Sequence, residues 1–306
     1  MDVYLKSMAQ NNQDHKLKKT AWGYHGSFRA MASPCELLMA TNDAAQANKM
    51  LQFAYSEAVR IEQKYSRFIQ HNPLWKINNS QGNKIAIDSE TYALLGFAKQ
   101  CHQLSEGEFD ISAGPIMKLW RFDGSSHTPN NNDILHAISH VGFSKVDFTE
   151  SHLRMPKGMS LDFGGIAKEY AVDKVANQLA SDFFDISVLI NFGGDIACPV
   201  ALIQGSWKVG IENPKKLDNA ATILNIRQGA LATSGDSRRF IEKNGSRYGH
   251  IINPQTGYPV ENAPRSVTVL SSSCITCGML TTMAMLQGDN AEQFLEAQNV
   301  KFKIFR

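Results

Sequence analysis

The segment from Leu161 to Asp173 places a carboxylate, a glycine pair and a lysine at a spacing that suits phosphate binding. Asp162 ends a short apolar run, Gly164 and Gly165 follow it, and apolar residues at helical spacing then begin. A strand, a Gly-Gly turn and a helix start bring backbone N–H groups to the positive end of a helix, where phosphate is readily held. A Gly-Gly turn before a helix more often only connects two elements, so phosphate binding is a hypothesis here.

Two further segments place carboxylates beside glycine turns. The segment Phe109–Pro115 contains Asp110, a serine hydroxyl and a Gly-Pro turn close together. This pattern fits a capped helix start as well as it fits a ligand site. Leu189–Ile196 is an apolar strand that is broken by a second Gly-Gly pair and followed by a carboxylate. Glycine within a strand pattern marks either a β-bulge or the close approach of a ligand. Both segments are candidates for a ligand site, with a structural role as the alternative.

Three polar segments follow in the second half of the chain. Ala232–Arg239 gathers hydroxyls, a carboxylate and two arginines, which suits phosphate or ribose but also a capped turn with solvated arginines. His250 is expected on a strand just before a loop rich in turn residues, where a proton-transfer group could sit, although a lone histidine is usually structural. Cys274 and Cys277 lack a second ligand pair for zinc, so we expect them to be small packing residues.

Composition limits the class of protein. The formal net charge of +2 in 306 residues argues against a dedicated nucleic-acid surface. No apolar stretch approaches the roughly 18 residues that a membrane span needs. The five cysteines are too few and too scattered for a disulfide framework, and the N-terminus lacks the apolar core of a signal peptide. We therefore expect a cytoplasmic protein in which residues 1–25 form a flexible lead-in.

Helices and strands alternate irregularly along the chain, which predicts an α+β fold. Helices are expected at 44–65, at 89–104 with Ser89 as the cap, and at 167–180 after the Gly-Gly turn. Residues 123–133 form the most linker-like stretch. The remaining predicted elements are strands at 28–40, 186–192, 207–212, 222–227 and 266–271, helices at 277–287 and 290–298, and a short terminal strand.

Taken in order, these segments resemble the ApbE family of FAD:protein FMN transferases. The similar elements are Met31 in AMASPC, Ser66-Arg-Phe68, Phe109–Pro115, Asp162–Lys168, Asn191–Asp195, Thr233–Asp236, His250–Pro254, Ser266–Val269 and Leu280–Thr282. The resemblance implies a single domain over 26–306 with mixed or antiparallel sheets, flanking helices and an FAD site between two lobes. It also implies that FAD is the substrate and that magnesium lies near the pyrophosphate.

The site residues of the family correspond to specific positions in this sequence. The resemblance implies a flavin site formed by Met31, Phe68, Phe109, Asp110, Ile111, Asp162, Lys168 and Ile252. The FAD pyrophosphate is expected near Gly164 and Gly165, and the metal ligands near the Gly165 backbone, position 278 and Thr282.

Two positions depart from the family pattern. Gly278 stands where the family usually has Asp, and Asn253 stands where it commonly has Asp. A glycine offers no carboxylate to magnesium, so a weakened metal site is expected, which Gly278→Asp should restore one helical turn before Thr282.

The implied reaction is phosphoryl transfer. A threonine or serine hydroxyl of a target protein attacks the FMN phosphorus of FAD, and AMP leaves. His250 is the candidate proton acceptor, and Lys168 and Arg238 are candidates for charge neutralisation. The family's targets are flavin-carrying redox subunits. The alternatives are an FAD-binding relative that lost transfer, acting as a flavin carrier or FAD pyrophosphatase, and a scaffold without a ligand.

Overall fold

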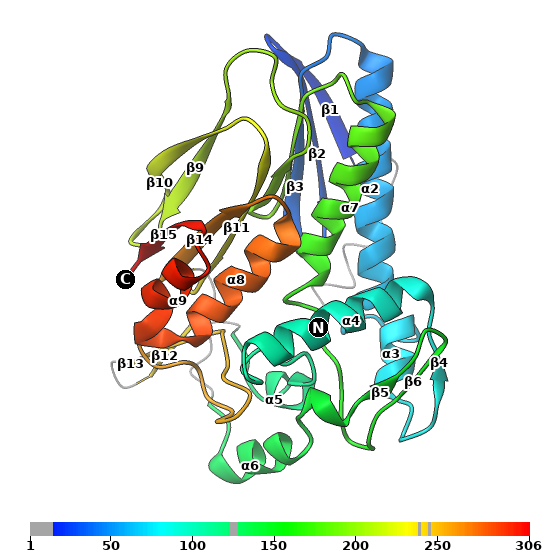
Figure 1. Ribbon diagram of the computed structural model, residues 1–306, viewed down its shortest axis with the longest axis vertical. Coiled ribbons are helices and arrows are strands. Elements are labelled where there is room, and N and C mark those ends of the chain that lie inside the picture. The colour runs from blue at the N-terminus through cyan, green and yellow to red at the C-terminus, as the bar shows by residue number, and fades with distance from the viewer. Residues whose placement is uncertain (1–14, 123–127, 238–239, 244–245) are drawn as a thin grey trace.

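The computed structural model describes residues 15–122, 128–237, 240–243 and 246–306 (Figure 1). The strands are β1 (His15–Thr20), β2 (Gly23–Ala30), β3 (Ser33–Met39), β4 (Ile85–Ala86), β5 (Asp147–Phe148), β6 (His152–Arg154), β7 (Val188–Phe192), β8 (Asp195–Cys198), β9 (Trp207–Asn213), β10 (Lys216–Ile226), β11 (Gly229–Gly235), β12 (Phe240–Lys243), β13 (Ser246–Gly249), β14 (Ser266–Ser271) and β15 (Lys301–Phe305). The helices are α2 (Ala44–Tyr65), α3 (Pro73–Asn78), α4 (Ser89–Leu104), α5 (Gly114–Met117), α6 (Asn131–Ser139), α7 (Ala167–Asp182), α8 (Cys274–Leu286) and α9 (Ala291–Ala297), with the short 3-10 helices η2 (Phe143–Lys145) and η3 (Gly288–Asn290).

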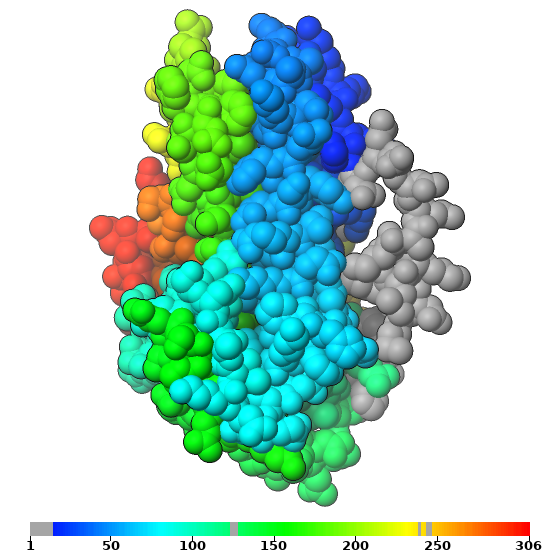
Figure 2. All heavy atoms as spheres, turned by 90° about the vertical axis from the view of Figure 1, so that its right-hand side faces the viewer, coloured from blue at the N-terminus to red at the C-terminus, as the bar shows by residue number. Residues whose placement is uncertain are grey.

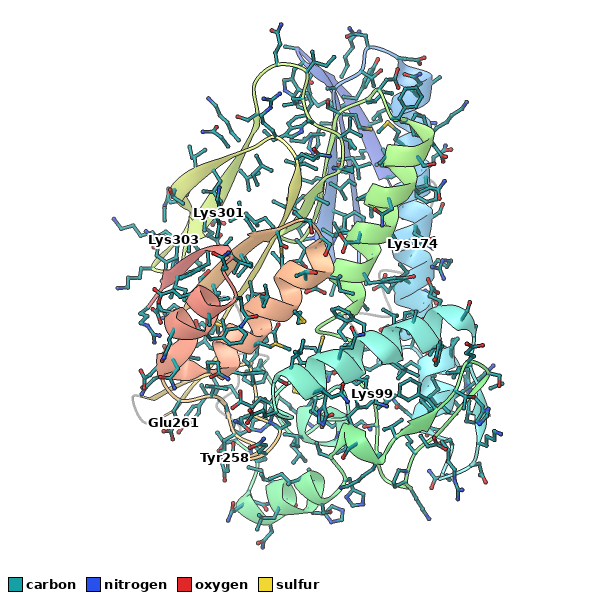
Figure 3. All side chains as sticks on the ribbon, viewed as in Figure 1. Lys99, Lys174, Tyr258, Glu261, Lys301 and Lys303 are labelled. Carbon is teal, nitrogen blue, oxygen red and sulfur yellow. The ribbon has the colours of Figure 1, made fainter. Side chains whose placement is uncertain are left out.

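An eight-stranded sheet forms the centre of the molecule, in the order β1-β2-β3-β7-β8-β11-β14-β15. Every neighbouring pair in it is antiparallel, which confirms the predicted α+β class. Both edge strands carry lysines, for example Lys301 and Lys303 on β15 (Figure 3). Charged side chains on an exposed edge discourage pairing with another chain.

Both faces of this sheet are buried, because its central strands alternate between two apolar clusters. Val188 and Ile190 of β7 belong to the large core cluster with α2, α7 and α8, whereas Leu189 points to the opposite face. On that opposite face the β9–β10 hairpin contributes Trp207 and Val209. Figures 1 and 2 show α2 and α7 side by side on the helical face. Because successive side chains of a strand point to opposite faces of the sheet, each central strand contributes to both apolar clusters.

A second lobe lies at one end of the helices and contains α3 to α6 and the small sheet β4-β6-β5 (Figure 1). It has its own apolar cluster around Trp120 and Ile134. The loop that carries Tyr258 and Glu261 lies between α9 and α6 (Figure 3), and the Tyr258 hydroxyl donates to the Asn131 side chain of α6 at 3.2 Å. None of the described helices is long and apolar enough to cross a membrane.

Several expected element boundaries are wrong. Residues 15–25, expected in a flexible lead-in, form β1 and the start of β2, while 1–14 lie outside the described residues. The single strand expected at 28–40 is a hairpin that turns at Met31 and Ala32, both with positive φ. Asp88, rather than Ser89, caps α4 through a bond from the Thr91 N–H. The linker-like stretch 123–133 runs into α6, and 123–127 are outside the described part.

Candidate functional site

Asp162 holds the Gly164-Gly165 turn in place. One carboxylate oxygen accepts the Gly164 N–H at 2.9 Å, and the other accepts from Arg67 Nη1 at 2.6 Å. The Asp162 N–H donates to the Ile111 carbonyl at 2.7 Å, which ties this segment to the Phe109–Pro115 segment. Both glycines are exposed, and α7 begins at Ala167, two residues later. The turn therefore presents accessible backbone at the N-terminus of a helix, as predicted.

Arg67 is a site residue that sequence reasoning passed over. Its guanidinium lies 4.9 Å from the centroid of the Phe68 ring, and that ring is 67% exposed. A planar cation and an aromatic face thus lie together beside the Asp162 turn. The available signals were the place of Arg67 within the family-like Ser66-Arg-Phe68 element and its adjacency to Phe68, while the 95-residue separation from Asp162 hides the ion pair.

The Phe109–Ile111 segment forms the floor under the glycine turn. Phe109 is buried, and a Cβ built on Gly165 would lie 3.8 Å from its ring, an ordinary contact distance. The Asp110 carboxylate accepts from the Ser112 N–H and hydroxyl and from the Phe143 N–H. Its side chain is therefore engaged in fixing this loop to η2, which is the structural role left open by the sequence.

The second Gly-Gly turn, Gly193-Gly194, joins β7 to β8. Both glycines have positive φ, 63° and 98°, a conformation that other residues rarely adopt. A Cβ on Gly193 would lie 2.6 Å from Ser33 Oγ, and the Gly193 N–H donates to the Pro34 carbonyl at 2.9 Å. The glycine thus allows the β2–β3 hairpin, which carries Met31, to approach this turn closely.

Lys168 lies three residues after the first glycine turn and contacts the second. Its ammonium lies 2.7 Å from the Asp195 carboxylate and donates to the Gly193 carbonyl at 3.4 Å. Burial alone would lower the pKa of Lys168, but the carboxylates of Asp195 and Glu169 outweigh it and raise that pKa. The Lys168 side chain remains 25% exposed, so a charged ammonium faces the site.

His250 lies just after β13 rather than within a strand, and its ring meets the edge of Phe122 at 6.3 Å between centroids. A cavity of about 160 Å³ adjoins it, with Gly249 and Ile251 in the wall. Arg238, the other catalytic candidate, lies outside the described residues. Ile252 is buried in the apolar cluster of the second lobe, apart from the cluster that holds Phe109.

The polar cluster around Asp236 is internally paired. Its carboxylate accepts from Arg265 Nε at 2.7 Å and from Arg247 Nε at 2.9 Å. Both arginines come from outside the Ala232–Arg239 segment, so the local pattern could not identify them. They are bound to a buried carboxylate, which is a fixed scaffold for the cavity wall.

Asn253 departs from the family pattern without a structural consequence. Its side-chain oxygen accepts the N–H groups of Gln255 and Thr256, at 2.8 and 3.2 Å. An aspartate would make the same turn, because either side chain offers the accepting oxygen. Cys274 and Cys277 are buried free thiols, which confirms that they are packing residues.

The expectation that Gly278→Asp restores a metal ligand stays a prediction, but a side chain at this position would meet Glu169 of α7. A Cβ on Gly278 would stand 2.6 Å from Glu169 Cγ and 2.8 Å from Glu169 Oε1. Thr282 follows one turn later on α8 and is half-buried. The described residues contain no group of three or more His, Cys, Asp or Glu side chains that could hold a metal. Glu169 Oε2, beside Gly278, is one of several buried side-chain oxygens without a hydrogen-bond partner within the described ranges, and an unpartnered carboxylate oxygen fits a cation at this place.

Comparison with known proteins gives one consistent result. Residues 31–304 match the ApbE family. The chain is 30% identical to an FAD:protein FMN transferase of Klebsiella pneumoniae, across 85% of this chain and 81% of the relative, and 31% identical to one of Vibrio cholerae, across 75% and 68%. The ApbE protein of Thermotoga maritima superposes with a TM-score of 0.84 at 26% identity, covering 92% of this chain and 93% of that one. The flavin transferase ApbE of Vibrio cholerae gives 0.80 at 24% identity and 94% coverage of both, which speaks for the fold alone.

Proposed function

This chain belongs to the ApbE family, and we propose that it is an FAD:protein FMN transferase. It would attach FMN from FAD to a threonine or serine of a flavin-carrying redox protein and release AMP. The observation that supports the proposal is that Lys168, three residues after the Gly164-Gly165 turn, contacts Asp195 and the carbonyl of Gly193 in the second Gly-Gly turn, in a chain whose relatives carry that activity. A cytoplasmic location stays a prediction from the sequence.

We place the FAD pyrophosphate at Gly164 and Gly165, where accessible backbone meets the N-terminus of α7. We expect the exposed Phe68 ring and the Phe109 ring beneath Gly165 to contact the flavin, and Met31 to contribute from the β2–β3 hairpin. Gly165→Leu should therefore abolish FAD retention while the protein stays folded, because only the ligand needs close approach at this point. Unchanged FAD affinity in this variant would contradict the placement.

The chemistry is a single displacement at phosphorus. The acceptor hydroxyl oxygen forms a bond to the FMN phosphorus, the bond from that phosphorus to the AMP oxygen breaks, and AMP leaves with the electron pair. His250 accepts the hydroxyl proton, since its unperturbed pKa lies near neutrality. Lys168 and Arg238 offset the charge that develops on the phosphoryl oxygens. Thr282 and the Gly165 backbone would hold a magnesium ion, which would supply further neutralisation of phosphate charge.

The test is incubation of the protein with FAD, Mg²⁺ and a purified flavin-carrying redox subunit. Intact-mass measurement of the subunit should show a covalent gain of one FMN, and the same subunit with its acceptor threonine changed to alanine should show none. Free FMN and AMP without an adduct would identify a pyrophosphatase instead. A colourless protein that takes up no FAD would identify an empty scaffold.

A further inference from the structure

We propose that Glu169 supplies the carboxylate ligand for a divalent cation that residue 278 does not provide in this chain. The inference rests on the proposed function, because the FAD phosphates would complete the coordination. It concerns a residue of α7 that no local sequence pattern distinguishes from other helix-surface glutamates.

The register between α7 and α8 brings Glu169 to Gly278. Asp173 accepts the N–H groups of Cys274 and Ile275 at 2.7 and 2.8 Å, which fixes the first turn of α8 against α7. Glu169 lies one turn before Asp173 on α7, and Gly278 lies one turn after Cys274 on α8. Residues four apart share a helix face. The contact between Asp173 and the start of α8 therefore also brings Glu169 next to Gly278.

The Glu169 side chain occupies the volume that a residue-278 side chain would need. Its Cγ, Oε1 and Cδ would lie 2.6, 2.8 and 2.9 Å from a Cβ on Gly278, closer than any ordinary contact. Glycine at 278 is therefore the residue that permits Glu169 to reach this place. The carboxylate absent from α8 is replaced by one that enters the same space from α7.

The Glu169 carboxylate lacks a compensating charge of its own. Glu169 is 8% exposed, and its Oε2 has no hydrogen-bond partner among residues that the structure describes. The neighbouring Lys168 ammonium is already paired with Asp195 at 2.7 Å. A buried ionised carboxylate is costly unless a cation accompanies it, and a divalent ion would be such a cation.

The remaining ligands suit magnesium rather than a metal held by side chains alone. Thr282 is half-buried on the same face of α8 as Gly278, and Gly165 lies two residues before the first residue of α7. Magnesium is usually bound by one or two carboxylates together with substrate phosphates and waters. A site with one carboxylate, one hydroxyl and one carbonyl would fill its other positions from FAD and water.

The test measures how strongly Mg²⁺ tightens FAD binding, by calorimetric titration with and without the ion. In the wild type we expect at least about a tenfold gain in FAD affinity with saturating Mg²⁺. Glu169→Gln, which keeps the shape and removes the charge, should reduce the gain to about twofold or less, with little change in metal-free FAD affinity. The exposed Glu296→Gln on α9 is the matched control and should behave as the wild type.

A double variant that moves the carboxylate from position 169 to position 278 distinguishes the loss of a metal ligand from a loss of folding. In Glu169→Ala/Gly278→Asp the clashing atoms are gone, so the aspartate should regain most of the Mg²⁺ effect that Glu169→Ala loses. A full Mg²⁺ effect in Glu169→Gln would overturn the inference, as would wild-type FAD binding that Mg²⁺ does not change. Both results leave the proposed function intact, whereas a wild type that binds no FAD under any condition would overturn that function and the inference with it.

Discussion

Gly278→Ala should destabilise this protein even though alanine is the better helix former. The added methyl group would point at the buried Glu169 side chain, with three of its atoms within 2.9 Å. The nearest of these is Cγ, close to the backbone, so a small rotation of the carboxylate cannot relieve the overlap. The whole side chain, or the spacing of α7 and α8, has to shift.

The size of the effect follows from two opposing terms. Forcing a methyl group into a filled site costs about 1–3 kcal/mol, while replacing a helix-interior glycine by alanine gains about 0.5–1 kcal/mol. We therefore expect a net loss of about 1–2 kcal/mol. In a Glu169→Ala background only the propensity gain remains, so the same change should stabilise by about 0.5–1 kcal/mol. The coupling energy between the two positions is then about 2 kcal/mol.

Urea unfolding of the four proteins of this cycle, without FAD, measures the coupling from the shift of the midpoint at constant slope. Gly96→Ala in α4 is the matched control, because a Cβ there would meet nothing within 4 Å. It should stabilise by about 0.5–1 kcal/mol. If Gly278→Ala stabilised the wild type to the same degree as Gly96→Ala, the space between α7 and α8 would not be filled by Glu169 as described.

Three further outcomes follow from the site and its support. Arg67→Ala should weaken FAD binding about tenfold, because a charged hydrogen bond to the carboxylate that holds the Gly-Gly turn is worth about 1.5–3 kcal/mol; an unchanged fluorescence titration would contradict this. His250→Asn should keep FAD affinity and slow transfer about a hundredfold, whereas a normal rate with a lower melting temperature would mean a structural histidine. Burial would raise the pKa of Glu90, but bonds from Arg60 and Lys64 outweigh it and lower the pKa to about 2. Because the folded-state pKa is lowered, the stabilisation by Glu90 is present above the unfolded value near 4.5 and is lost as the pH falls toward 2. The stability gap between wild type and Glu90→Gln should therefore narrow over that range in urea unfolding, and a gap that does not change with pH would refute the ion-pair account.

The sequence predicts local structure well where periodicity is strong. The bounds of α2 and α4 agree with those expected, because their apolar residues recur at helical spacing over many turns. The β2–β3 hairpin was missed because Met31 and Ala32 form its turn with positive φ and no glycine marks it. Strand β1 was missed because an edge strand with three lysines in six residues resembles a solvated tail.

The residues of the candidate site likewise fall into those that local patterns reveal and those that they do not. Asp162, the two Gly-Gly pairs and Lys168 were identifiable because each lies in a short pattern with a chemical meaning. The partners that make them a site come from distant positions: Arg67 for Asp162, and Glu169 for Gly278. Those pairs depend on how α2, α7 and α8 pack, which local spacing does not encode.

The most direct test of the proposed function compares two products in one reaction. The protein, FAD, Mg²⁺ and an acceptor redox subunit are mixed, and AMP and covalently bound FMN are measured over the same time course. A transferase predicts one AMP released for each FMN attached to the subunit, and no AMP above background when the acceptor threonine is replaced by alanine. AMP that accumulates without attached FMN, at a rate independent of the acceptor, would contradict FMN transfer as the function of this protein.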